Sequence, residues 1–130
     1  MGGKTILLVE DNAENAELVK RFLGKHEHKV IWAQNGTEAV QLYQNHRPDL
    51  VLLDIMMPGI DGFVTLRKMR AFDEQWGKRS VIIMLTARGG TEDVLTAVRH
   101  GANDYLVKPI SEERLIAKVN KYLGGVVKSS

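Results

Sequence analysis

Charged and hydroxyl side chains stand at or just after the ends of four short apolar runs in this sequence. Glu10 and Asp11 follow the first run, Asp54 follows the third, Thr86 ends the fourth and Lys108 follows the fifth. Carboxylates supply the oxygen ligands that a hard divalent cation prefers, and a hydroxyl and an ammonium group can both donate to a phosphate. These residue types therefore favour phosphoryl transfer to a carboxylate beside a metal ion.

Five apolar runs alternate with five amphipathic segments. Aliphatic and β-branched residues predict strands at Thr5–Val9, Lys29–Ala33, Asp49–Leu53, Val81–Thr86 and Asp104–Val107. Between them, apolar residues three and four positions apart predict helices. The third and fourth runs are apolar almost throughout, as central strands require, whereas the second suits an edge. The pattern predicts an α/β fold: a single doubly wound (βα)5 domain, flavodoxin-like, with a five-stranded parallel sheet in the order 2-1-3-4-5.

The predicted strand order brings the polar side chains together. Open α/β sheets bind ligands beyond the carboxyl ends of their strands, where the strand order reverses. With the first strand beside the third, Glu10, Asp11 and Asp54 converge there, and Thr86 and Lys108 lie close by. Three carboxylates repel one another, and a divalent cation such as Mg²⁺ removes that penalty. Asp54 ends a central strand, so it is the best placed to act as a nucleophile toward phosphorus.

Four segments resemble the response-regulator receiver family and occur in the order typical of that family. They are Val9–Asn12, Leu53–Gly62, Leu85–Ala87 and Asp104–Pro109. The resemblance extends over residues 4–123. It implies a two-component phosphorelay in which a histidine kinase or a histidine phosphotransfer domain phosphorylates Asp54. Such a protein is not an enzyme in the usual sense, because it catalyses only its own phosphorylation and dephosphorylation.

The resemblance also implies a set of metal ligands. Asp11, Asp54 and the backbone carbonyl of Met56 would bind Mg²⁺, for which Mn²⁺ or another divalent cation can substitute, and Glu10 would contribute through water. Many relatives carry Asp where this chain has Glu10, so the contact of the longer side chain is harder to place. The Lys108–Pro109 peptide bond is expected to be cis, which aims the lysine at the phosphoryl group.

Tyr105 resembles the switch aromatic of the family. Phosphorylation adds about two negative charges at Asp54. Thr86 would move toward them, and Tyr105 would turn into the space left behind. The surface of the fourth helix, fifth strand and fifth helix would then change its affinity for an unknown downstream protein. The expected state is a monomer or a phosphorylation-dependent dimer.

Composition restricts the other classes of function. The 130 residues include 18 Lys and Arg, 16 Asp and Glu, and no Cys. A net charge of +2 is too small to indicate direct nucleic-acid binding, and thiolate sites are excluded. No apolar run approaches the ~18 residues of a membrane span, so a soluble, cytoplasmic protein is expected. We expect one domain over residues 1–130, with a core at about 4–123 and a loose tail at 124–130.

Three other classes of protein share parts of this pattern. A pseudo-receiver binds partners without phosphorylation, but its site residues would be degraded, whereas here they are complete. A flavodoxin-like FMN carrier needs a hydroxyl- and glycine-rich phosphate loop after the first strand, where Glu10, Asp11 and Asn12 would repel phosphate unless a metal ion intervened. A metal-dependent phosphatase with an aspartate nucleophile needs a second acid two residues after Asp54, where Met56 stands.

Two expectations concern the surface around the third helix. The basic residues there are predicted to form a solvated surface; they are Arg67, Lys68, Arg70, Lys78 and Arg79. Trp76 is assigned to a longer loop before the fourth strand, either as a cover over the edge of the core or as an exposed contact.

Overall fold

The computed structural model describes residues 4–54, 56–57, 60–87 and 91–124. Its elements are β1 (Thr5–Val9), α1 (Ala13–Gly24), β2 (Lys29–Ala33), α2 (Gly36–His46), β3 (Leu50–Asp54), β4 (Met56–Met57), β5 (Ile60–Asp61), α3 (Gly62–Trp76), β6 (Val81–Thr86), α4 (Thr91–Arg99), β7 (Asp104–Val107) and α5 (Glu112–Leu123). A five-stranded parallel sheet has the order β2-β1-β3-β6-β7. The predicted α/β class and the order 2-1-3-4-5 are confirmed. β4 and β5 form a short antiparallel pair that was not predicted.

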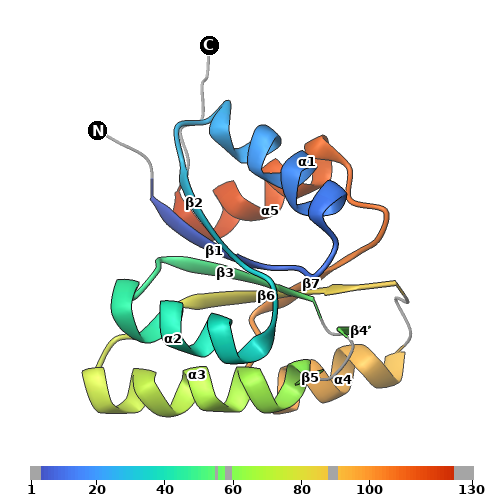
Figure 1. Ribbon diagram of the computed structural model, residues 1–130. Coiled ribbons are helices and arrows are strands. Elements are labelled where there is room, and N and C mark those ends of the chain that lie inside the picture. The colour runs from blue at the N-terminus through green and yellow to red at the C-terminus, as the bar shows by residue number, and fades with distance from the viewer. Residues whose placement is uncertain (1–3, 55, 58–59, 88–90, 125–130) are drawn as a thin grey trace.

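Helices cover both faces of the sheet, with α1 and α5 on one face and α2, α3 and α4 on the other (Figure 1). Successive residues of a strand point to opposite faces. In β1, Ile6 and Leu8 pack on the α1–α5 side, whereas Leu7 and Val9 pack on the other. β3 is buried at every position, as a strand covered on both faces requires. The sheet therefore divides the core into two layers and holds the strand ends between them.

Polar side chains begin several helices directly after the strands. Asn12 accepts a hydrogen bond from the backbone N–H of Asn15 at 2.9 Å and starts α1. Asn35 accepts one from the N–H of Glu38 at 2.8 Å and starts α2. Ser111 accepts one from the N–H of Arg114 at 3.2 Å and starts α5. Each cap satisfies an N–H group that has no partner inside the helix and so fixes where the chain turns away from the sheet.

Trp76 is the last residue of α3, so its assignment to a loop is wrong. Its ring stacks on Tyr43 and Phe72, with centroid distances of 5.6 and 5.5 Å. The guanidinium of Arg47 lies 4.4 Å from the same ring. Stacking of this kind stabilises the last turn of the helix against α2. Of the two roles considered for Trp76, that of a cover over the edge of the core fits these contacts.

The first residue of the predicted tail, Gly124, caps the carboxyl end of α5. Gly124 has a φ of 64° and donates its N–H to the carbonyl of Asn120, which caps the helix. Residues 125–130 lie outside the described residues. In the part of the chain that the structure describes, no helix has the length and apolar content of a membrane span.

Candidate functional site

The carboxyl ends of β3, β6 and β7 meet at one edge of the sheet. In the strand register, Asp54 stands opposite Leu85, and Thr86 stands opposite Val107. The N–H of Lys108 donates to the carbonyl of Thr86 at 2.7 Å, which continues the pairing past the end of β7. Asp54 and Thr86 are buried, with 1% and 2% of their surface exposed. The sheet therefore brings together three residues that the sequence places far apart.

Three carboxylates form a cluster at this edge. Glu10, Asp11 and Asp54 each contribute one oxygen, and these oxygens lie within 4.8 Å of one another. Glu10 and Asp54 are buried, but Asp11 is exposed, so the cluster opens to solvent on the Asp11 side. Mg²⁺ takes oxygen ligands and keeps several of its waters. A cluster of carboxylates with one open side therefore fits that ion.

Lys108 supplies a positive charge between two of these carboxylates. Its Nζ lies 2.7 Å from Oδ2 of Asp54 and 3.3 Å from Oε1 of Glu10. Burial lowers the pKa of Lys108, but the hydrogen bond and charge of Asp54 and the charge of Glu10 outweigh that effect, so its pKa lies above the ordinary value. Lys108 is therefore a cation at neutral pH and offsets part of the acidic charge. The Lys108–Pro109 peptide bond is cis, as the resemblance implied.

Glu10 is held by contacts that the sequence alone did not indicate. Its backbone carbonyl accepts a hydrogen bond from Nε1 of Trp32 at 2.7 Å, and its Oε2 accepts one from the N–H of Asn12 at 3.2 Å. Burial raises the pKa of Glu10, although the N–H of Asn12 and the charge of Lys108 act in the opposite direction. The longer side chain thus contacts both the start of α1 and Lys108.

The sequence also assigns roles to Met56 and Tyr105. Met56 lies in β4, and a role for its carbonyl as a metal ligand stays a prediction. Tyr105 is half-buried on β7 and packs against the core on the α2–α3 side. Nζ of Lys118 lies 5.7 Å from the centroid of its ring. The switch role of Tyr105 and Thr86 also stays a prediction.

The structure combines a doubly wound parallel sheet with acids, a hydroxyl and a lysine at the carboxyl ends of its strands. Residues 6–120 match the family model described as "Response regulator receiver domain". The chain belongs to this family and is a receiver domain of a two-component system, similar to the chemotaxis protein CheY.

Two curated relatives match nearly the whole chain. The chain is 39% identical over 119 residues to "Chemotaxis protein CheY" of Bacillus subtilis (strain 168), which covers 91% of this chain and 96% of that protein. It is 37% identical over 120 residues to "Protein PilH" of Pseudomonas aeruginosa, which covers 92% of this chain and 98% of that protein. In both relatives, therefore, the matched region is almost the entire protein.

Solved structures agree with this assignment. Chemotaxis protein CheY4 of Vibrio cholerae matches with a TM-score of 0.86 and 28% identity, over 94% of this chain and 100% of that one. A chain in the Saccharomyces cerevisiae co-crystal of the histidine phosphotransfer protein Ypd1 and the receiver domain of Ssk1 matches with a TM-score of 0.89 and 28% identity. That match covers 98% of this chain and 94% of the other. The fold and its topology are thus shared with known receiver domains.

Proposed function

We propose that this receiver domain accepts a phosphoryl group on Asp54 from a histidine kinase or a histidine phosphotransfer protein, with Mg²⁺ bound beside it. The proposal rests mainly on one observation: the buried Asp54 carboxylate lies 2.7 Å from the ammonium of Lys108, within a cluster of acidic oxygen ligands. In this proposal, residues 1–130 form one receiver domain with a core at 4–123. The protein acts in the cytoplasm, because the kinases of such relays use ATP as the phosphoryl source.

Asp54 is the nucleophile in this proposal. One of its carboxylate oxygens attacks the phosphorus of a phosphohistidine; the O–P bond forms as the P–N bond breaks, and the electron pair of that bond returns to the donor imidazole. Lys108 stays protonated and moves its charge from the carboxylate to the phosphoryl oxygens, where negative charge gathers in the transition state. Thr86 donates its hydroxyl to one of the same oxygens.

The acidic cluster holds the metal in this proposal. Asp11 and Asp54 bind Mg²⁺ directly, together with the backbone carbonyl of Met56 that the family resemblance implies, and Glu10 contributes through water. Mn²⁺ or another oxygen-seeking divalent cation can replace it. When bound, the ion supplies positive charge next to the phosphoryl oxygens. The support for this assignment is the oxygen-only donor set and its open, solvent-facing side.

The donor approaches over α1 and the segment after β7. A cavity of about 350 Å³ lies there, lined by Glu10, Lys108 and apolar side chains that include Leu18 and Ile110. Leu18 is 38% exposed, which gives a protein donor an apolar contact next to the acidic cluster. The Ypd1–Ssk1 co-crystal, in which a receiver domain is paired with a histidine phosphotransfer protein, supports a donor of this class.

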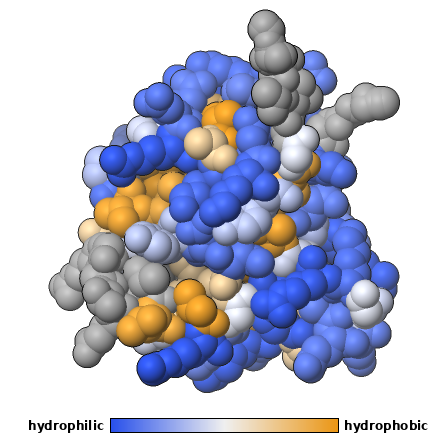
Figure 2. Space-filling model, turned by 180° about the vertical axis from the view of Figure 1, so that it is seen from behind, coloured by the Kyte–Doolittle hydropathy of each residue, from blue (hydrophilic) through white to orange (hydrophobic). Residues whose placement is uncertain are grey.

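The output surface is formed by α4, β7 and α5. Leu95 and Val98 on α4 are 47% and 55% exposed, and Tyr105 lies on β7. Figure 2 shows apolar surface in separate patches among hydrophilic side chains, which suits a contact for a protein partner rather than a buried core face. Movement of Thr86 and Tyr105 on phosphorylation changes this surface. The protein acts as a monomer or as a phosphorylation-dependent dimer and makes no direct contact with nucleic acid or membrane.

The direct test uses a small phosphodonor. The purified protein is incubated with acetyl phosphate and either Mg²⁺ or a chelator, and its intact mass is measured over time. We expect a gain of one phosphoryl group with Mg²⁺ and none with the chelator, because the carboxylates cannot hold the charged donor without the ion. A protein that gains no mass under either condition would act as a pseudo-receiver, and the proposal would be wrong.

A further inference from the structure

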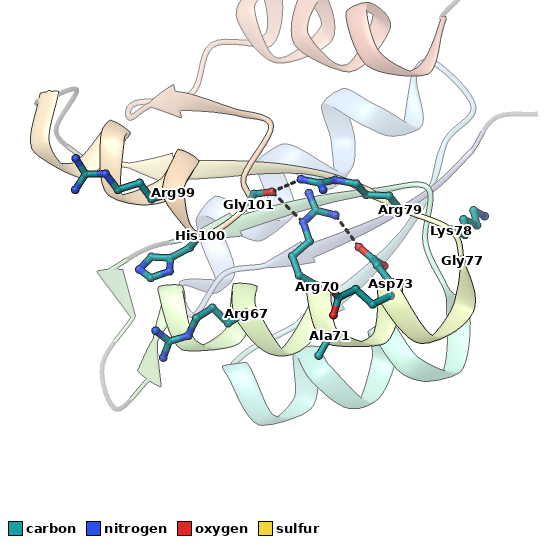
Figure 3. Close-up of a pocket in the computed structure, with 11 residues that line it drawn as sticks. Arg67, Arg70, Ala71, Asp73, Gly77, Lys78, Arg79, Arg99, His100 and Gly101 are labelled. Atoms are coloured by element: carbon teal, nitrogen blue, oxygen red, sulfur yellow. Dashed lines mark hydrogen bonds and ion pairs between the residues drawn. The ribbon is translucent and has the colours of Figure 1, made fainter.

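A second charged region lies near the start of β6 and β7, at the opposite end of the sheet from the acidic cluster. It is a cavity of about 450 Å³ beside α3 (Figure 3). Five cationic side chains line it, Arg67, Arg70, Lys78, Arg79 and Arg99, against two acidic ones. With His100 neutral, this leaves an excess of three positive charges, which is more than the +2 of the whole chain. The region is therefore a local concentration of positive charge.

Arg70 forms a fixed part of this pocket, so the prediction that it belongs to a solvated surface is wrong. Only 12% of its side chain is exposed. Its Nε donates to the carbonyl of Gly101 at 2.9 Å, and its Nη1 donates to Asp73 and to the carbonyl of Ser80, both at 2.7 Å. Its Nη2 donates to Oδ1 of Asn103 at 2.8 Å. These hydrogen bonds join α3 to the segments before β6 and β7, so the Arg70 side chain is held in one position in the pocket.

Two guanidinium groups converge on one carbonyl in the pocket. Nη2 of Arg79 also donates to the carbonyl of Gly101, at 3.2 Å, and Figure 3 shows the two arginine side chains side by side there. Burial lowers the pKa of Arg70 and the charge of Arg79 adds to that effect, which the hydrogen bond with Asp73 opposes without cancelling it. Gly101 has a φ of 104°, and a Cβ there would lie 3.1 Å from Cγ of Arg70, so this approach requires glycine. A bound anion would offset the repulsion between the two cations.

Arg67 and Arg99 have unused hydrogen-bonding capacity. Both are exposed, and neither forms an ion pair with a residue that the structure describes. Figure 3 shows them with His100 on one side of Gly101, while Lys78 lies on the other side. A guanidinium presents a planar set of donors that matches phosphate oxygens in pairs. Donors at several separate points along the cavity suit a ligand with more than one anionic group.

We propose that this basic pocket binds a small anion that carries two or more phosphate groups. The cavity volume is in the range of small-molecule sites, and four of its five cations are arginines. Nucleic acid is a poorer match, because it requires a basic surface that extends along many phosphates, whereas Asp73 and Glu74 interrupt this one. The site is separate from Asp54 and would act independently of phosphoryl acceptance.

Calorimetric titration with pyrophosphate tests this proposal. The full chain is titrated in low-salt buffer with a chelator, so that no metal ion links the ligand to the acidic cluster. We expect saturable binding to one site, weaker binding of inorganic phosphate and of citrate, and movement of the His100 ring signals in NMR spectra. The double variant Arg67→Gln/Arg99→Gln should bind pyrophosphate about tenfold or more weakly, since it loses charged donors.

An arginine outside the pocket provides the matched control. Arg21 is exposed on the last turn of α1, and Arg21→Gln changes the net charge without touching the cavity. The affinity of the Arg21→Gln variant for pyrophosphate should stay within about twofold of the wild-type value. Thermal unfolding of each variant checks that it is folded. No saturable binding by the wild type, equal losses in the Arg21 and pocket variants, or citrate binding as tight as that of pyrophosphate would each overturn the proposal.

Discussion

Replacing Lys108 by Met should slow phosphorylation by acetyl phosphate about 10²–10³-fold, the usual effect of removing one charged or hydrogen-bonding group from a transition state. The structural reason is the position of the ammonium, which lies 2.7 Å from the carboxylate of Asp54, the proposed phosphoryl acceptor. The variant lacks the ammonium that would offset negative charge on the phosphoryl oxygens, and among the described side chains only the Thr86 hydroxyl would still donate to them. The rate is measured by intact mass at saturating Mg²⁺.

Lys118→Met is the matched control for this variant. Lys118 also pairs with a partly buried aspartate, since its Nζ lies 2.7 Å from Oδ1 of Asp104, but it lies on α5 away from the acidic cluster. The Lys118→Met variant should be phosphorylated at close to the wild-type rate. Circular dichroism with Mg²⁺ present shows whether each variant is folded. A Lys108→Met rate within threefold of wild type, in a folded protein, would remove Lys108 from the proposed mechanism.

Replacing Arg70 by Met should lower the free energy of unfolding by about 3–5 kcal/mol, the range expected when one partner of a buried ion pair is removed. Arg70 makes four hydrogen bonds, and its loss leaves the carboxylate of Asp73 buried without a counter-charge. Tyr43 donates to that carboxylate, but it brings no charge. The carbonyls of Ser80 and Gly101 lose a donor as well. Urea unfolding at neutral pH measures the change.

Arg67→Met is a suitable comparison, because Arg67 lies on the same helix but is exposed and has no ion pair with a described residue. Its effect on stability should be within about 0.5 kcal/mol. A second variant, Arg70→Met/Asp73→Asn, should regain part of the loss, since it removes the unpaired charge. An Arg70→Met variant that loses less than about 1 kcal/mol would show that the network is not needed for stability.

Much of the fold and the acidic cluster could be predicted because the strands are recognisable from local runs of apolar residues and the rules of parallel sheets place their ends together. Each strand appears as an apolar run, and in a parallel sheet the residues that follow the runs must meet at one edge. Asp54 and Thr86 needed only the strand order to be placed together. The observed β3 begins and ends one residue later than the predicted run, which leaves Asp54 at its end in either case.

Contacts between distant segments could not be predicted in the same way. Arg70 appears in the sequence as one of several basic residues on a helix, but its partners Ser80, Gly101 and Asn103 come from two later segments. The end of α3 at Trp76 could not be predicted either, because the stacking of Trp76 on Tyr43 depends on how α2 and α3 pack. The hydrogen bond from Trp32 to Glu10 was missed for the same reason.

The position of the phosphoryl group on the chain tests the central claim most directly. Borohydride reduces an acyl phosphate to the alcohol, so a phosphorylated aspartate becomes homoserine and can be located by peptide mass spectrometry. After reaction with acetyl phosphate and Mg²⁺, we predict homoserine at position 54 and nowhere else, and no conversion in Asp54→Asn. Conversion at Asp11, conversion at Asp49, which directly precedes β3, or an equal mass gain in Asp54→Asn would contradict the account.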